Sequence, residues 1–308
     1  MFSKRRKSNR AEYPIPAPAP APASSTAPPP PPWIELPEDL TANILQRLDA
    51  EEIIMSAMLV CSTWWRVCKN PSMWRVIDLD YRRCQHPDDF DDILSAVDFG
   101  IVWRSAMDRS QGQLVELKLT YLESEDGILN YIAERSSQLR CLTLERYFGR
   151  DHVAWTDAIK KFTQLEELHY IMMPEFDIKD FETIGTSCPM LKSFTYNESW
   201  CEQSEEEDDI DDGVRFSIQY GVAIGKTMPN LRHLRIWALE TRNEGLEAIL
   251  NGCPHLESLD LRRCYGLDLE GDLGKRCCEQ IKHLKLPSDC ASDLEVRLKS
   301  FEDIFWGF

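Results

Sequence analysis

The sequence lacks any apolar run that approaches the ~20 residues a membrane-spanning helix needs. Residues 1–10 are basic but lead into prolines rather than an apolar stretch, so we expect no secretory signal. Basic charge is also scarce, with 35 lysine and arginine residues against 52 aspartate and glutamate residues and a net charge of -17. Because phosphate binding needs a basic surface, this balance argues against a general nucleic-acid or membrane-surface binder.

Paired cysteines are missing as well. The 11 cysteines form no CxxC pair, which argues against a disulfide framework and against a zinc site recognisable by its spacing. Cys188, Cys253 and Cys264 instead stand beside leucine patterns, which predicts buried free thiols in a reducing compartment. We therefore expect no metal and no other cofactor.

A local catalytic set is the third absence. The stretch 221–227 looks like a phosphate-binding loop, but only three residues separate its glycines where that loop needs four. The six histidines are scattered, and no Ser/His/Asp or Cys/His arrangement is visible, although such sets need not be local. We expect a protein that is not an enzyme.

The stretch 33–74 is instead rich in apolar residues at helical spacing. Leu36-Pro37 predicts a helix start, and Leu40, Ile44 and Leu48 then recur four apart on one face. A second helix is predicted from Asp49, because Glu52 follows three residues later. A third is predicted from Ser62 to Asn70, where Pro71 ends it. Three short helices supply little core of their own, so the surplus apolar surface indicates a partner surface.

This segment resembles the F-box motif. The residues that carry the resemblance are Leu36-Pro37-Glu38-Asp39-Leu40, Ile44-Leu45, Leu48, Val60-Cys61, Trp65-Arg66, Pro71 and Trp74. In that family the segment docks a Skp-type adaptor, which bridges to a cullin scaffold. The resemblance implies that the adaptor-binding residues are Leu36, Pro37, Leu40, Ile44, Leu45, Leu48, Val60, Cys61, Trp65 and Trp74. The alternative is an ordinary small helical bundle that begins the next domain.

Beyond this segment the chain repeats. The pattern Leu-x-x-Leu-x-Leu, or a close variant, begins at Leu114, Leu139, Leu165, Leu191, Leu231, Leu256 and Ile281. These first positions differ by 25, 26, 26, 40, 25 and 25 residues. A constant period in the twenties with this core is a leucine-rich-repeat signature, in which each repeat contributes a short strand and stacked neighbours share a core.

The predicted fold is therefore α/β, with a three-helix F-box followed by a leucine-rich-repeat solenoid of about seven to eight repeats. Ile77 and Leu79 have the same rhythm and predict a first strand, which a helix over 88–110 joins to the array. We expect four parts: a disordered Pro/Ala-rich tail at 1–32, the F-box at 33–80, the repeats at 81–287 and a C-terminal cap at 288–308. The one long step contains an acidic insertion at about 198–213, either a solvated loop or a docking site for a basic segment.

Residues between the strand leucines should point to the exposed face of the solenoid. In the later repeats they form a mostly basic strip with one large aromatic, in an otherwise acidic protein. We expect a target of acidic or phosphorylated character to bind at His233, Arg235, Trp237, Asp260, Arg262, Arg263 and Lys285. The alternative is that these positions are polar simply because they are exposed.

The layout resembles the compact plant F-box/leucine-rich-repeat proteins. The resemblance implies a non-catalytic substrate-recognition subunit of an SCF-type ubiquitin ligase, located in the nucleus or the cytoplasm. Its partners would be a Skp-type adaptor, through it a cullin-RING ligase, and an unknown protein substrate. The alternative is a leucine-rich-repeat scaffold or regulator that acts outside a cullin ligase. The basic run 4–7 is either a nuclear import signal or a solvated tail.

Overall fold

The computed structural model describes residues 36–84, 92–121, 127–146, 152–173, 176–198 and 210–292. The described residues from Pro37 onward belong to one compact unit. The expected tail at 1–32, most of the acidic insertion and the end of the expected cap lie outside the described residues. Within the described part of the chain, no helix is both long and apolar enough to cross a bilayer.

The first segment is helical, as predicted. Its elements are α1 (Glu38–Leu45), α2 (Ala50–Met55), the 3-10 turn η2 (Ala57–Leu59), α3 (Ser62–Cys68) and the 3-10 turn η3 (Pro71–Trp74). Pro37 caps α1 rather than occupying its first turn. Asp49 and Glu52 form the predicted capping box at the start of α2.

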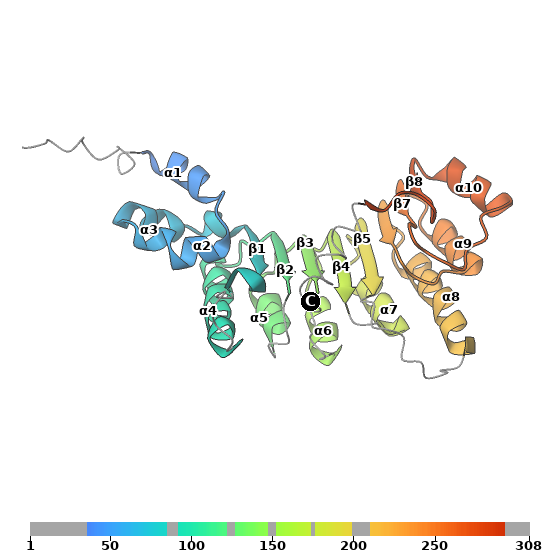
Figure 1. The fold of residues 1–308 in the computed structure, drawn as a ribbon, viewed down its shortest axis with the longest axis horizontal. Helices are drawn as coiled ribbons and strands as arrows, with labels where there is room; N and C mark the ends of the chain where they lie inside the picture. The colour runs from blue at the N-terminus through green and yellow to red at the C-terminus, as the bar shows by residue number, and fades with distance from the viewer. Residues whose placement is uncertain are drawn as a thin grey trace, which may run out of the picture. The chain divides into compact units, whose positions relative to one another are not determined.

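The repeats form a sheet of eight parallel strands in sequence order, β1 to β8 (Figure 1). The strands are β1 (Val76–Asp80), β2 (Glu116–Thr120), β3 (Cys141–Glu145), β4 (Glu167–Met173), β5 (Ser193–Glu198), β6 (His233–Ile236), β7 (Ser258–Asp260) and β8 (His283–Lys285). The second apolar position of every repeat is in register with the next, in the order Ile77, Leu117, Leu142, Leu168, Phe194, Leu234, Leu259 and Leu284. The leucine-rich-repeat prediction and the extra first strand are confirmed.

Helices connect the strands and bury their apolar faces against the sheet. They are α4 (Asp92–Ser110), α5 (Ile128–Arg135), α6 (His152–Ile159), α7 (Ile178–Ser187), α8 (Ile210–Thr227), α9 (Asn243–Gly252) and α10 (Asp272–Gln280), with the 3-10 turn η4 (Tyr81–Cys84) after β1. Figure 1 shows α4 to α8 on the same side of the strands. Ile132 and Leu246, on α5 and α9, join the strand leucines in a continuous core, as the helical spacing predicts.

A longer helix accounts for part of the long step between repeats. Helix α8 has 18 residues where α9 has 10. It begins at Ile210, so the last residues of the predicted acidic loop, 210–213, are helical instead. The stretch that resembles a phosphate-binding loop lies inside α8. Its glycines allow close helix packing, because a Cβ on Gly221 would lie 2.5 Å from the Gly245 carbonyl oxygen of α9.

Candidate functional site

Exposed apolar side chains concentrate in the helical segment. Six large ones lie there, with the exposed fraction of the residue in brackets: Leu40 (49%), Ile44 (42%), Met55 (47%), Leu59 (78%), Val60 (61%) and Trp65 (46%). We call these six residues the apolar docking face. So many exposed apolar residues within one short segment are typical of a protein-interaction site.

The helices that carry this face are fixed to each other. Leu40 and Ile44 are one turn apart on α1 and therefore share a side of that helix. The guanidinium of Arg66 on α3 contacts the Glu38 carboxylate of α1 at 2.7 Å. The Lys69 ammonium lies 3.7 Å from the centre of the Trp65 ring, which orients that indole.

The expected adaptor-binding residues divide by burial. Those that are exposed are Pro37, Leu40, Ile44, Val60 and Trp65, and those partly exposed are Leu36, Leu48 and Cys61. Leu45 and Trp74 are buried, at 0% and 1% exposure, and the Trp74 indole donates a hydrogen bond to the Cys68 carbonyl at 2.7 Å. We therefore reassign these two residues from direct contact to the core that supports the face.

Met55 and Leu59 belong to the face but were not among the expected residues. The F-box resemblance includes Val60 and Cys61 but not Leu59, the residue before them. The run of apolar residues through η2 and the turn after it was the available signal. A single three-residue 3-10 turn cannot bury every side chain of such a run, so at least one has to face outward.

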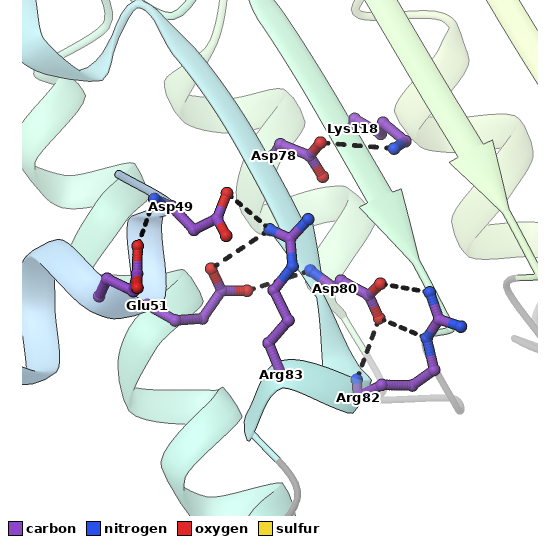
Figure 2. A network of polar contacts seen from close by, with 8 residues as sticks. Asp49, Glu51, Asp78, Asp80, Arg82, Arg83 and Lys118 are labelled. Carbon is purple, nitrogen blue, oxygen red and sulfur yellow. Dashed lines mark hydrogen bonds and ion pairs between the residues drawn. The ribbon is translucent and has the colours of Figure 1, made fainter. Parts of the chain in front are cut away.

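A polar network joins the helical segment to the first strand (Figure 2). Glu51 on α2 accepts a hydrogen bond from the backbone N–H of Asp80 on β1 at 3.0 Å. Arg83 contacts the Asp49 carboxylate at 2.9 Å and the Glu51 carboxylate at 3.9 Å. Burial raises the pKa of Glu51, although the hydrogen bonds and Arg83 oppose that shift. The network holds α2, the helix that carries Met55 of the docking face, against β1.

On the other candidate surface, polar residues of β4 to β8 line a groove of about 180 Å³. The polar side chains along it are His169, Ser193, Thr195, His233, Arg235, Ser258, Asp260 and Lys285. We call this the strand groove. Two cationic side chains, Arg235 and Lys285, and two histidines line it together with the single carboxylate of Asp260, and this balance favours an anionic ligand. The residues of β4 and β5 were not among the expected set, but strand register brings them beside those of β6.

The expected target-binding residues also divide by burial. His233, Arg263 and Lys285 are exposed and Arg235 is partly exposed, whereas Trp237, Asp260 and Arg262 are buried. Trp237 has 1% exposure and packs with Ile171 and Met172 of β4. The sequence predicted that Trp237 and Arg262 contact a target directly. Both residues are buried, so they are not accessible to a target in this structure.

Asp260 organises the cations of the strand groove. Arg262 donates two hydrogen bonds of 2.8 Å to its carboxylate. Arg235 Nε lies 3.2 Å and Lys285 Nζ 3.7 Å from Asp260 Oδ2. Burial alone would raise the pKa of Asp260, but the hydrogen bonds and charge of Arg262, with the charge of Arg235, outweigh it and hold that pKa below its ordinary value. One ionised carboxylate thus positions the partly exposed Arg235 and the exposed Lys285 at the groove.

Comparisons with known proteins agree with this architecture. Residues 33–80 match the model of the F-box-like family. Two Arabidopsis thaliana proteins extend the similarity. F-box/LRR-repeat protein 23 is 42% identical over 259 residues, which are 83% of this chain and 54% of that protein. F-box protein SKIP19 is 40% identical over 271 residues, which are 88% of this chain and 82% of that protein.

A third relative gives the same result. F-box/LRR-repeat protein 21 of Arabidopsis thaliana is 38% identical over 268 residues, which are 85% of this chain and 83% of that protein. The chain belongs to the plant F-box/LRR-repeat family. It spans about half the length of the first of these relatives and about four fifths of the other two.

Proposed function

We propose that this chain is the substrate-recognition subunit of an SCF-type ubiquitin ligase. F-box domains in general bind Skp-type adaptors, and the family match covers the segment that carries the apolar docking face. The observation that supports the proposal best is the exposure of Leu59, Val60 and Trp65 within that segment. Exposed apolar residues at this density need a partner surface in solution.

The proposed mechanism is tethering, without chemistry by this chain. The apolar docking face holds the adaptor, and through it a cullin-RING ligase, while the repeats hold the target. Because the network around Glu51 holds α2 against β1, the target keeps a constant distance from the ligase. Lysines of the target then meet the conjugating enzyme at high effective concentration. Such a subunit acts in the nucleus or the cytoplasm, where its partners are.

Co-purification with a Skp-type adaptor tests the docking face. Val60→Asp should weaken adaptor binding at least about 30-fold, the equivalent of about 2 kcal/mol, because a carboxylate would be buried without a partner. Val222→Asp is the matched control, since Val222 is an exposed apolar residue of α8 far from this segment in the sequence. Adaptor binding that both variants retain would remove the docking face from the proposal.

The proposed target-binding site is the strand groove, and the proposed target segment is acidic or phosphorylated. Arg235 and Lys285 are the accessible cations there, held in place by Asp260. Carboxylates and phosphates form their strongest hydrogen bonds with such groups, and the hydroxyls of Thr195 and Ser258 can add further donors. The negative charge of the rest of the chain would repel an acidic segment from other surfaces.

Charge reversal at the groove tests this site separately from adaptor binding. Arg235→Glu combined with Lys285→Glu should abolish the capture of target proteins by the complex of chain and adaptor. Lys282→Glu is the matched control, because Lys282 is exposed and pairs with Glu257 outside the groove. Arg262 is unsuitable for this purpose, since a second carboxylate beside the buried Asp260 would disturb the fold. Target capture that survives the double reversal would exclude the groove.

A further inference from the structure

Three metal-binding types of side chain meet on the exposed side of β3 and β4. They are Cys141 of β3 with Glu167 and His169 of β4. Cys141 and Glu167 are directly opposite each other in the strand register, and His169 follows Glu167 on the same side of its strand. The donor atoms of all three lie within 4.8 Å of one another, and His169 Nε2 is 3.5 Å from Glu167 Oε2.

These separations approach those of a tetrahedral zinc site. Zinc–ligand bond lengths place nitrogen and oxygen ligands about 3.4 Å apart and nitrogen and sulfur ligands about 3.6 Å apart. The His169–Glu167 pair already has this spacing. The remaining donors would have to close by about 1 Å, which a change of side-chain torsion within the allowed range provides.

A neighbouring hydroxyl orients the imidazole for such a role. Thr195 Oγ1 on β5 lies 2.9 Å from His169 Nδ1. When that nitrogen donates its proton to the hydroxyl, the lone pair of the ring is on Nε2, the atom that faces Glu167. A hydrogen bond to the second ring nitrogen is the usual support of a histidine that binds a metal.

The local charge also favours a cation. Glu116 on β2 is in register with Cys141, so carboxylates flank the thiol from both neighbouring strands. A bound divalent cation would offset the negative charge of both carboxylates.

We propose that Cys141, Glu167 and His169 bind a divalent transition-metal ion, with zinc as the ion that their sulfur, oxygen and nitrogen donors match best. Binding releases the Cys141 proton to solvent. The fourth position goes to Glu116 or to water. Because His169 also lines the strand groove, the ion lies beside the proposed target-binding site. The metal proposal does not depend on the ligase function.

Metal titration of the full chain tests the site. Cobalt(II) should bind with one-to-one stoichiometry and give the charge-transfer absorption of a cobalt–thiolate bond, and zinc(II) should displace it. Cys141→Ser and His169→Gln should each remove the absorption. Cys278→Ser is the matched control and should retain it, because Cys278 is an exposed cysteine of a distant repeat.

Thr195→Val provides a second, milder test. It keeps the three donors but removes the hydrogen bond to His169, so zinc affinity should fall about 10–100-fold while the chain stays folded by circular dichroism. The proposal is overturned if the full chain shows no thiolate absorption with cobalt, or if Cys141→Ser and His169→Gln bind metal as the wild type does. In that case His169 and Glu167 form only an ion pair.

Discussion

Asp260→Ala is the substitution whose consequence follows most directly from the structure. It removes the one carboxylate that Arg262, Arg235 and Lys285 share. Arg262 has only 2% exposure and cannot turn its guanidinium into water without moving the backbone. Arg262 also donates a hydrogen bond to the Cys290 carbonyl oxygen, at 3.1 Å. The variant therefore takes from a buried guanidinium the carboxylate that accepts its two 2.8 Å hydrogen bonds.

Breaking a buried ion pair from one side costs about 3–5 kcal/mol. The loss of the contacts to Arg235 and Lys285 should change the free energy of unfolding little, because the charges of these exposed groups are hydrated. The free energy of unfolding should thus fall by about 3–5 kcal/mol, and the melting temperature by on the order of 10 °C. Replacing both partners, Asp260→Ala with Arg262→Met, should recover much of the loss, since the buried positive charge is then removed together with its carboxylate.

The effect should depend on pH. The pKa of Asp260 is lowered in the folded chain, so its contribution is present above the unfolded value of about 3.9 and is lost as the pH falls through the folded value. Urea denaturation of the wild type, the single variant and the double variant at pH 7 and near pH 3 measures this. Equal stability of wild type and Asp260→Ala at pH 7, or a double variant less stable than the single one, would refute the reasoning.

Three further predictions concern the core and the junction. Leu259→Ala should lower the free energy of unfolding by about 2–5 kcal/mol, because Leu259 is fully buried between Leu234 and Leu284. The control Leu40→Ala, on the docking face, should change stability little in thermal melting. Gly225→Ala should lower the free energy of unfolding by about 1–3 kcal/mol, since the new Cβ would lie 2.7 Å from the Ala248 carbonyl carbon. A raised melting temperature would contradict the tight contact between α8 and α9. Glu51→Ala should lower the free energy of unfolding by about 1–3 kcal/mol, because the Asp80 N–H loses its acceptor. Glu51→Gln keeps an acceptor and should be at least as stable as the wild type at pH 7. The reason is that burial disfavours the charged form of Glu51 and raises its pKa. Equal loss in both Glu51 variants, measured by denaturation, would disprove that last point.

The repeats could be predicted from the sequence because the signal is periodic and physical. A stacked strand needs an apolar residue at the same position in every repeat, so most positions of the register were visible as a spacing of 25 or 26 residues. Even the extra first strand followed from the same spacing at Trp74, Ile77 and Leu79.

The predictions of exposed side chains were wrong where the strands end. Alternation of inward and outward residues holds only inside a strand, and β6 ends at Ile236 while β7 ends at Asp260. Just beyond them the backbone adopts positive φ, 57° at Ala238 and 60° at Arg263. Trp237 and Arg262 lie in these turns and point into the protein, so the exposed positions expected for them were wrong.

The Cys141, Glu167 and His169 cluster was hidden for another reason. Cys141 lies 26 residues before Glu167, and Glu167 and His169, which are close in sequence, do not have the spacing of a known metal-site motif. No metal-site pattern therefore appears along the chain. Stacking of successive repeats brings them together, and only the register of β3 on β4 reveals that they are neighbours. The same holds for the residues that line the strand groove.

The assembly of the chain with a Skp-type adaptor and a cullin tests the central claim most directly. Size-exclusion chromatography of the three purified proteins should show a single complex with one copy of each, and Val60→Asp should separate this chain from it. A chain that binds the adaptor but leaves the cullin in its own peak would contradict the ligase account and support a scaffold that acts outside a cullin ligase.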